Sequence, residues 1–216
     1  MVIGVWNLAL LSMDKITQIL QFWFEGVDDN TPIDNKSNPF KKWFTKDEKF
    51  DREIKEKFEA HLIRARWGQY REWESSIDRR LAITILFDQF SRNMFRNTPR
   101  MFENDPLAVD LTLRSINEEM DKQLLLIHRI FLYTPLMHSE ERRIQELSIK
   151  YFGNLVEEAK QKIPANAHYY EYSYGYAQRH QEIIQRFGRF PHRNKILGRT
   201  STREEIEFLR KPDSSF

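Results

Sequence analysis

Apolar side chains recur every three or four residues along most of the chain, which is the period of one face of an α-helix. The segment at residues 16–24 shows this pattern, because Ile16, Ile19, Leu20, Trp23 and Phe24 fall on one stripe. The same period predicts further helices over 50–65, 80–95, 105–117, 121–135, 139–156, 169–187 and 202–209. No segment alternates apolar and polar residues as a strand does, so we expect about eight helices and no sheet.

Residues with capping chemistry mark where several of these helices begin and end. Asx, serine and threonine side chains accept hydrogen bonds from free N–H groups, and glycine tolerates the left-handed backbone that closes a helix. Predicted starts are Asp14, Asp105 followed by Pro106, Asp121, Ser139 and the capping box of Thr202 with Glu205, and the first helix should end at Gly26. Residues 27–40 are rich in Asp, Asn and Pro and should form a long loop.

Composition favours the same architecture. Seven glycines, eight prolines and five valines among 216 residues supply few turns and few strand-forming positions. We therefore predict an all-α domain of antiparallel stacked helices. A repeat of 34 or 40 residues is not convincing, although Ala60, Gly68 and Tyr70 faintly resemble a helical-hairpin repeat.

The length fits one compact domain, which we expect over residues 13–216, with 1–12 as a peripheral N-terminal extension. No apolar stretch is long enough to span a bilayer and no signal-peptide pattern is visible, so we expect a cytoplasmic protein without membrane contact. The absence of cysteine excludes disulfides, Cys-based zinc sites, iron–sulfur clusters and thiol catalysis.

Four polar residues interrupt the most apolar helix, at 80–95. Asp88 and Arg92 are one turn apart and share a face, as do Gln89 and Asn93. A buried carboxylate and guanidinium must pair, because leaving either alone inside a protein is costly. These residues therefore either form a buried salt bridge or point into a ligand pocket.

Positive charge is concentrated near the C-terminus. Residues 179–203 contain seven Lys and Arg and a single acid, Glu182, in a chain whose net charge is only +2. Within them, Gly188 and Pro191 interrupt helix, so an irregular loop should present Arg189, His192, Arg193 and Asn194. Such a loop suits a phosphate or carboxylate, or else clasps neighbouring helix ends. Nucleic acid is an unlikely partner at this net charge and without a recognition helix.

Histidines supply the candidate acid–base groups. His138 and Glu140 precede a predicted helix and His180 lies in a later one, so these three residues are the catalytic candidates. They could also coordinate a metal ion, but no spacing typical of a zinc site or of a catalytic template is present. We predict no metal site and no cofactor.

Five strings together resemble the bacterial family known as domain of unknown function 924. They are FWF at 22–24, KWF at 42–44, LFDQFSRNMFR at 86–96, YTPLMHSE at 133–140 and RFGRFPHRNKILGRTSTREEIEFL at 186–209. The resemblance covers about residues 14–216 and implies a helical fold similar to tetratricopeptide-repeat proteins, with no established activity. Its motif positions include the polar residues discussed above, together with Ser139, Gly198 and Thr202.

Three hypotheses for function follow. The first is a binding module whose pocket holds a small anionic ligand or an acidic peptide terminus. Its predicted ligand-binding residues are Asp88, Arg92, Asn93, His138, Arg189, His192, Arg193, Asn194 and Arg199. The second is a hydrolase or lyase in which His138 or His180 transfers a proton and Glu140 orients it. The third is purely structural, with the polar residues acting as clasps in a chain that binds a protein partner.

Overall fold

The computed structural model describes residues 15–33, 40–212 and 214–215. Every regular element in these parts of the chain is helical, which confirms the predicted all-α class. The α-helices are α2 (Lys15–Phe24), α3 (Phe40–Phe44), α4 (Glu48–Arg66), α5 (Ile77–Ile85), α6 (Ser91–Met94), α7 (Asp105–Asn117), α8 (Leu126–His138), α9 (Arg142–Lys162), α10 (Ala167–Phe187) and α11 (Arg203–Leu209). Residues 1–12 and the predicted cap at Asp14 lie outside the described residues.

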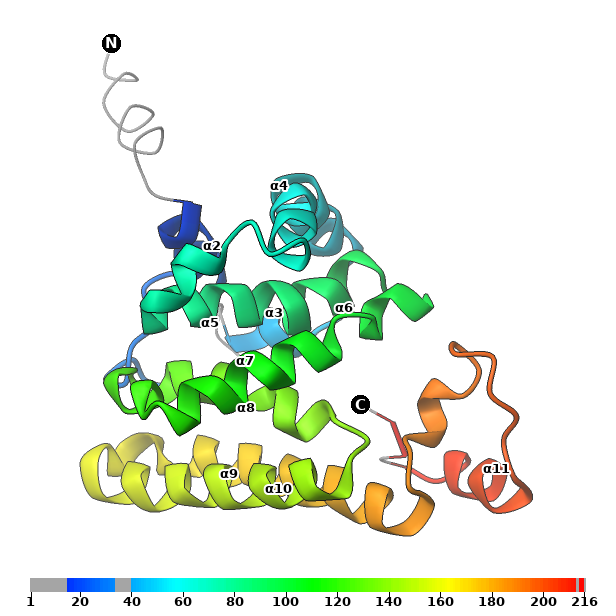
Figure 1. Cartoon of the computed structure of the whole chain (residues 1–216). Coiled ribbons are helices and arrows are strands. Elements are labelled where there is room, and N and C mark those ends of the chain that lie inside the picture. The colour runs from blue at the N-terminus through cyan, green and yellow to red at the C-terminus, as the bar shows by residue number, and fades with distance from the viewer. Residues whose placement is uncertain (1–14, 34–39, 213, 216) are drawn as a thin grey trace.

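The helices stack in layers (Figure 1). The N-terminal helices up to α6 form the upper part of the view, α7 and α8 cross the middle, and α9 and α10 lie antiparallel below them. The chain then turns back, so that α11 and the segment before it lie beside one end of the stack. This return brings the arginine-rich segment towards helices that precede it by many residues.

A cluster of aromatic rings lies within the core, among aliphatic side chains. Trp23 of α2 is fully buried and contacts Trp43, Phe90 and Phe131, with ring centroids 5.5–6.2 Å apart. Such pairs add about 0.5–1.5 kcal/mol each beyond the burial of their area. Since these rings come from α2, α3, η2 (Leu86–Phe90) and α8, they join the upper helices to the middle layer.

The predicted helix at 80–95 is confirmed but contains one irregular turn. Helices α5 and α6 are continuous through η2 (Leu86–Phe90), which is a π-helical turn. A π turn inserts an extra residue into the helix and occurs often at functional sites. It carries Asp88 and Gln89, two of the polar residues singled out from the sequence.

Helix α8 differs from its prediction at both ends. It begins at Leu126 instead of Asp121, because the carboxylate of Asp29 accepts the N–H groups of Leu126 and Ile127 at 2.9 and 2.8 Å. Asp121 lies instead in a short 3₁₀ turn, η4 (Met120–Gln123).

The sequence predicts that this helix ends at Pro135. In the structure the helix continues through Pro135 and ends at His138. Proline lacks the N–H that would donate to the carbonyl oxygen of Phe131. Hydroxyl groups donate to the two carbonyl oxygens on either side of it. Thr134 donates to Ile130 and Thr112 of α7 donates to Leu132, each at 2.7 Å.

Two other predicted starts are displaced by a few residues. The N-cap position of helix α7 is Asn104, one residue before Asp105, and the Asn104 side chain makes no capping hydrogen bond. Helix α9 begins at Arg142 instead of Ser139, because the buried amide of Gln145 donates to the carbonyl oxygens of Met137 and Ser139 and holds the connection in a non-helical turn.

The capping box of Thr202 and Glu205 is confirmed at the start of α11. Among the described residues no helix is long and apolar enough to cross a membrane. A tetratricopeptide-like repeat stays a prediction.

Candidate functional site

Three segments that are far apart in the sequence meet at one end of the helical stack. They are the π turn η2, the junction after α8, and the irregular loop around η6 (Pro191–Arg193). Their side chains form what we call the His138 cluster, which comprises Asp88, Arg92, Asp105, His138 and Arg193. The predicted salt bridge between Asp88 and Arg92 is confirmed, with an oxygen-to-nitrogen distance of 2.9 Å.

Asp88 is the buried centre of this cluster. Its side chain has no exposed surface, and one carboxylate oxygen lies 2.6 Å from Nδ1 of His138. The other oxygen accepts a hydrogen bond from the amide of Gln89. Although burial alone raises the pKa of a carboxyl group, Arg92 and His138 hold the pKa of Asp88 down at about 2. Asp88 is therefore ionised and acts as a hydrogen-bond acceptor.

His138 is held by this carboxylate through one nitrogen only. Burial and the nearby Arg92 lower its pKa, so that the imidazole is neutral near pH 7. The proton then lies on Nδ1, which donates to Asp88, and Nε2 carries a lone pair. No described residue makes a hydrogen bond with Nε2, and the side chain keeps 17% of its exposure. His138 thus has the geometry of an oriented general base.

Two arginines border His138. Arg92 donates to both oxygens of Asp105, at 2.8 and 2.9 Å, and Arg193 donates to one of them at 3.2 Å and to the backbone oxygen of His138 at 2.9 Å. The guanidinium of Arg193 also lies between the rings of Phe102 and Phe190, 4.4 and 4.5 Å from their centroids. Burial and the charge of Arg92 lower the pKa of Arg193 to about 10, so it stays charged at neutral pH.

The remaining predicted arginines form a second set of contacts, the C-terminal clasp, made of Glu140, Arg189, Asn194, Arg199 and Glu205. Glu140 accepts two hydrogen bonds from Arg199, at 2.7 and 2.9 Å, and one from the backbone N–H of Phe190 at 2.8 Å. Glu205 accepts two from Arg189, at 2.6 and 2.8 Å. Asn194 accepts from Nε of Arg199 and donates to Glu205, so it joins the two pairs. The clasp fastens the loop before α11 to the end of α8.

The two other candidate histidines, His180 and His192, lie near His138. The ring of His180 is 5.9 Å from that of His138, and its Nδ1 lies 2.8 Å from the backbone oxygen of Tyr176. Burial and His138 lower the pKa of His180 well below its ordinary value. Burial and Arg193 lower the pKa of His192 to about 4. All three histidines are therefore neutral at pH 7.

Two expectations about individual residues are wrong. Glu140 does not orient His138, because Glu140 is bonded to Arg199, and Asp88 is the carboxylate that touches the imidazole. Asn93 turns away from the cluster, and its amide donates to Asp51 at 2.8 Å, beside Arg96. The actual partners of Glu140 and Asn93 are set by the packing of separate helices, and the spacing of residues along the chain does not reveal them.

Asp105 belongs to the His138 cluster and the ring of Phe102 lies against Arg193, but the sequence pattern indicated neither residue as part of a site. Asp105 was interpreted only as a helix cap, and its position three residues after Phe102 carries no recognisable motif.

The charges of the site are balanced. Each of the predicted arginines contacts a carboxylate of the protein: Arg92 and Arg193 contact Asp105, Arg199 contacts Glu140 and Arg189 contacts Glu205. An anionic ligand would have to compete with these carboxylates. Within the described part of the chain, no group of three or more His, Asp or Glu side chains is placed to hold a metal ion.

The family follows from comparison with known proteins. A family model described as "Bacterial protein of unknown function (DUF924)" matches residues 19–213. The chain belongs to the DUF924 family. The solved structure of a protein of unknown function, ATU0120 from Agrobacterium tumefaciens, is similar to this DUF924 chain, with 30% identity and a TM-score of 0.74. The match covers 93% of this chain and 97% of that one. No curated protein matches the chain.

Proposed function

We propose that this protein is an acid–base enzyme in which His138 exchanges a proton with a small anionic substrate. The single observation that carries the proposal is the contact of 2.6 Å between Nδ1 of His138 and the fully buried carboxylate of Asp88. A carboxylate in that position fixes the tautomer and the orientation of the imidazole, and it stabilises the imidazolium that forms when Nε2 takes up a proton.

The position of Asp88 in a π-helical turn supports this role. The turn disrupts the regular backbone hydrogen bonding of a largely buried helix, and π turns of this kind occur often at functional sites. A salt bridge between Asp88 and Arg92 alone needs no π turn, because an ordinary helix places residues four apart on one face.

The arginines favour a substrate with a carboxylate or phosphate group. The guanidinium of Arg193 donates to the backbone oxygen of His138 at 2.9 Å. Arg92 is close enough for its charge, together with burial, to lower the pKa of His138. Arg92 retains 15% side-chain exposure. A substrate anion that displaced Asp105 from the guanidinium groups of Arg92 and Arg193 would be held beside Nε2 of His138.

Binding without catalysis is the second candidate. The C-terminal clasp favours it, because Arg189 and Arg199 keep 29% and 24% of their side-chain exposure, so an anion from solvent can reach them and compete with Glu205 and Glu140. In this case the ligand is a small anion or the acidic end of a peptide. Substitution of Arg189 and Arg193 by alanine should then abolish binding while the fold persists.

A structural role for the same ion pairs, with a protein partner bound elsewhere, is the remaining hypothesis. Under each of these hypotheses we place the protein in the cytoplasm. A chain without cysteine forms no disulfide bonds and is compatible with a reducing compartment. We assign it no metal, no cofactor and no nucleic-acid partner.

Carbethoxylation by diethyl pyrocarbonate tests whether Nε2 of His138 is a free base. At pH 6 the reagent should modify His138, because a neutral and accessible imidazole is nucleophilic. His168 is an exposed histidine distant in sequence from the site and serves as the control. Mass spectrometry should find His138 protected by a bound phosphorylated or carboxylated metabolite, while modification of His168 is unchanged. A His138 that does not react contradicts the proposal.

Turnover is then measured with a panel of p-nitrophenyl esters and p-nitrophenyl phosphate. We expect His138→Ala to abolish hydrolysis and to leave the thermal shift caused by the substrate nearly unchanged, whereas His168→Ala should retain both. Unchanged turnover in His138→Ala would refute the catalytic role. Binding of metabolites without any turnover would favour the second candidate.

A further inference from the structure

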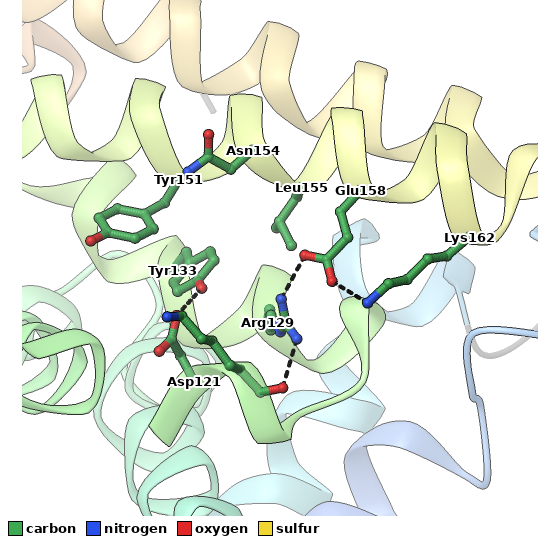
Figure 2. A pocket seen from close by; sticks show the side chains of 9 residues that line it. Asp121, Arg129, Tyr133, Tyr151, Asn154, Leu155, Glu158 and Lys162 are labelled. Atoms are coloured by element: carbon green, nitrogen blue, oxygen red, sulfur yellow. Dashed lines mark hydrogen bonds and ion pairs between the residues drawn. The ribbon is translucent and has the colours of Figure 1, made fainter. Parts of the chain in front are cut away.

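A separate hollow lies between the 3₁₀ turn η4, helix α8 and helix α9 (Figure 2). Its volume is about 380 Å³, which falls in the range of roughly 300–1,000 Å³ typical of small-molecule sites. The residues that line it are Asp121, Lys122, Arg129, Tyr133, Tyr151, Asn154, Leu155, Glu158 and Lys162. None of them belongs to the His138 cluster or the C-terminal clasp.

Asp121 has an oxygen atom that no protein group satisfies. The residue is 4% exposed, and its Oδ2 accepts a hydrogen bond of 2.5 Å from the hydroxyl of Tyr133. Its Oδ1 is buried and has no hydrogen-bond partner among the described residues. Burial and the bond to Asp121 raise the pKa of Tyr133, so the phenol stays protonated. Tyr133 is therefore the donor of this pair and Asp121 the acceptor.

The cations around the hollow are bonded to other groups. Arg129 donates to Glu158 at 2.8 Å and to backbone oxygens of Leu124 and Lys122. Lys162 pairs with Glu158 at 2.6 Å, and Lys122 pairs with Glu119 at 2.5 Å. Among the described residues no cation is bonded to Asp121, although the charge of Asp121 helps to raise the pKa of the nearby Lys122. A buried carboxylate without a bonded counter-ion is costly unless a ligand supplies the missing donor.

The wall beside Asp121 is aromatic. The rings of Tyr133 and Tyr151 have centroids 5.2 Å apart and are inclined by 46° (Figure 2). The faces of such rings are electron-rich and attract organic cations, and their carbon atoms contact apolar groups. An ammonium group that donates to Oδ1 would have these rings and Leu155 next to its substituent.

We propose that this hollow binds a small organic ammonium ion with an apolar or aromatic substituent. The ammonium group donates to Oδ1 of Asp121, and the substituent packs against the wall that the two contacting tyrosine rings form. An organic cation suits the hollow better than a metal ion, because the described residues offer no group of three carboxylate or imidazole ligands. This site is independent of the function proposed for His138.

Calorimetric titration with benzylammonium chloride tests the proposal, with benzyl alcohol as the uncharged probe of the same shape. Benzylammonium should bind roughly tenfold or more tightly than benzyl alcohol. Asp121→Asn keeps an acceptor for Tyr133 but removes the charge, and it should lose most of this preference. The matched control is Asp110→Asn, which removes an exposed carboxylate on α7 that pairs with Arg114 and should leave binding unchanged.

Equal affinities for the two probes, or unchanged benzylammonium binding in Asp121→Asn, would overturn the proposal. If Asp121→Asn does not fold, Tyr151→Leu decides the question, because Tyr151 is only half-buried and leucine keeps an apolar wall. We expect benzylammonium to bind several-fold more weakly to Tyr151→Leu. Unchanged binding to that variant also overturns the proposal.

Discussion

Replacement of Asp88 by asparagine removes the negative charge to which Arg92 and His138 are bonded. The residue has no exposed surface, so the variant buries the charge of Arg92 with one carboxylate fewer. Removal of one partner from a buried ion pair costs about 3–5 kcal/mol, and we expect the lower value because Arg92 keeps its two bonds to Asp105. The free energy of unfolding at pH 7 should therefore fall by about 3 kcal/mol.

The pH dependence of this loss follows from the pKa of Asp88. Arg92 and His138 lower it from 3.8 in the unfolded chain to about 2 in the folded protein. A carboxyl group with a lowered pKa stabilises the fold above pH 3.8, and this contribution disappears as the pH falls through 2. At 1.36 kcal/mol per pKa unit the whole contribution is about 2 kcal/mol, of which about half is lost at pH 3. The difference between wild type and Asp88→Asn should thus shrink by about 1 kcal/mol between pH 5 and pH 3.

Urea unfolding followed by tryptophan fluorescence measures this difference, because Trp23 and Trp43 are buried in the core. Asp110→Asn is the control, since its carboxylate is exposed on α7. A difference that stays constant from pH 5 to pH 3 would show that the pKa of Asp88 is not lowered. A variant as stable as wild type at pH 7 would refute the argument that Asp88 compensates buried positive charge.

Three further predictions concern other contacts. Burial lowers the pKa of His192 from 6.5 to about 4, so the free energy of unfolding should fall by about 3 kcal/mol as the pH decreases from 6.5 through 4 and the unfolded chain takes up a proton. His192→Gln should flatten this part of the pH profile measured by urea unfolding, and an unchanged profile would contradict the lowered pKa of His192. Asn166→Ala removes three hydrogen bonds to the backbone of residues 29–33, so the free energy of unfolding measured by calorimetry should fall by about 3 kcal/mol. A decrease below about 1 kcal/mol would show that these hydrogen bonds contribute little to stability. Glu140→Gln weakens the C-terminal clasp, so amide hydrogen exchange in residues 188–202 should accelerate roughly tenfold while α9 is unaffected; equal rates would argue against the clasp.

Local features were predictable from the sequence because their partners lie within one or two helical turns. The three-to-four-residue period of apolar side chains predicted most helices, and the spacing of Thr202 and Glu205 predicted the capping box that they form. The salt bridge between Asp88 and Arg92 belongs to the same class, since residues four apart share a helix face whatever the tertiary structure. The resemblance to DUF924 likewise rested on contiguous strings.

The helix boundaries that were wrong depended on distant groups. Helix α8 begins where Asp29 reaches its N-terminus across 97 residues, and it passes Pro135 where Thr112 of another helix bonds to a carbonyl oxygen. Nothing in residues 121–138 encodes either contact. A prediction made from local preferences therefore placed both ends too early.

Local sequence was enough to predict the all-α class, most helices and a polar, arginine-rich C-terminal segment, and it offered the pairing of Asp88 with Arg92 as one of two alternatives. The packing of separate helices established that pairing, brought Asp88 to His138 and Arg193 to Asp105, and left an unsatisfied oxygen of Asp121 beside a hollow. The physical reason is that helix formation depends on neighbours along the chain. A site depends on which faces of separate helices pack together, over sequence distances of 50 residues for Asp88 with His138 and 88 for Asp105 with Arg193.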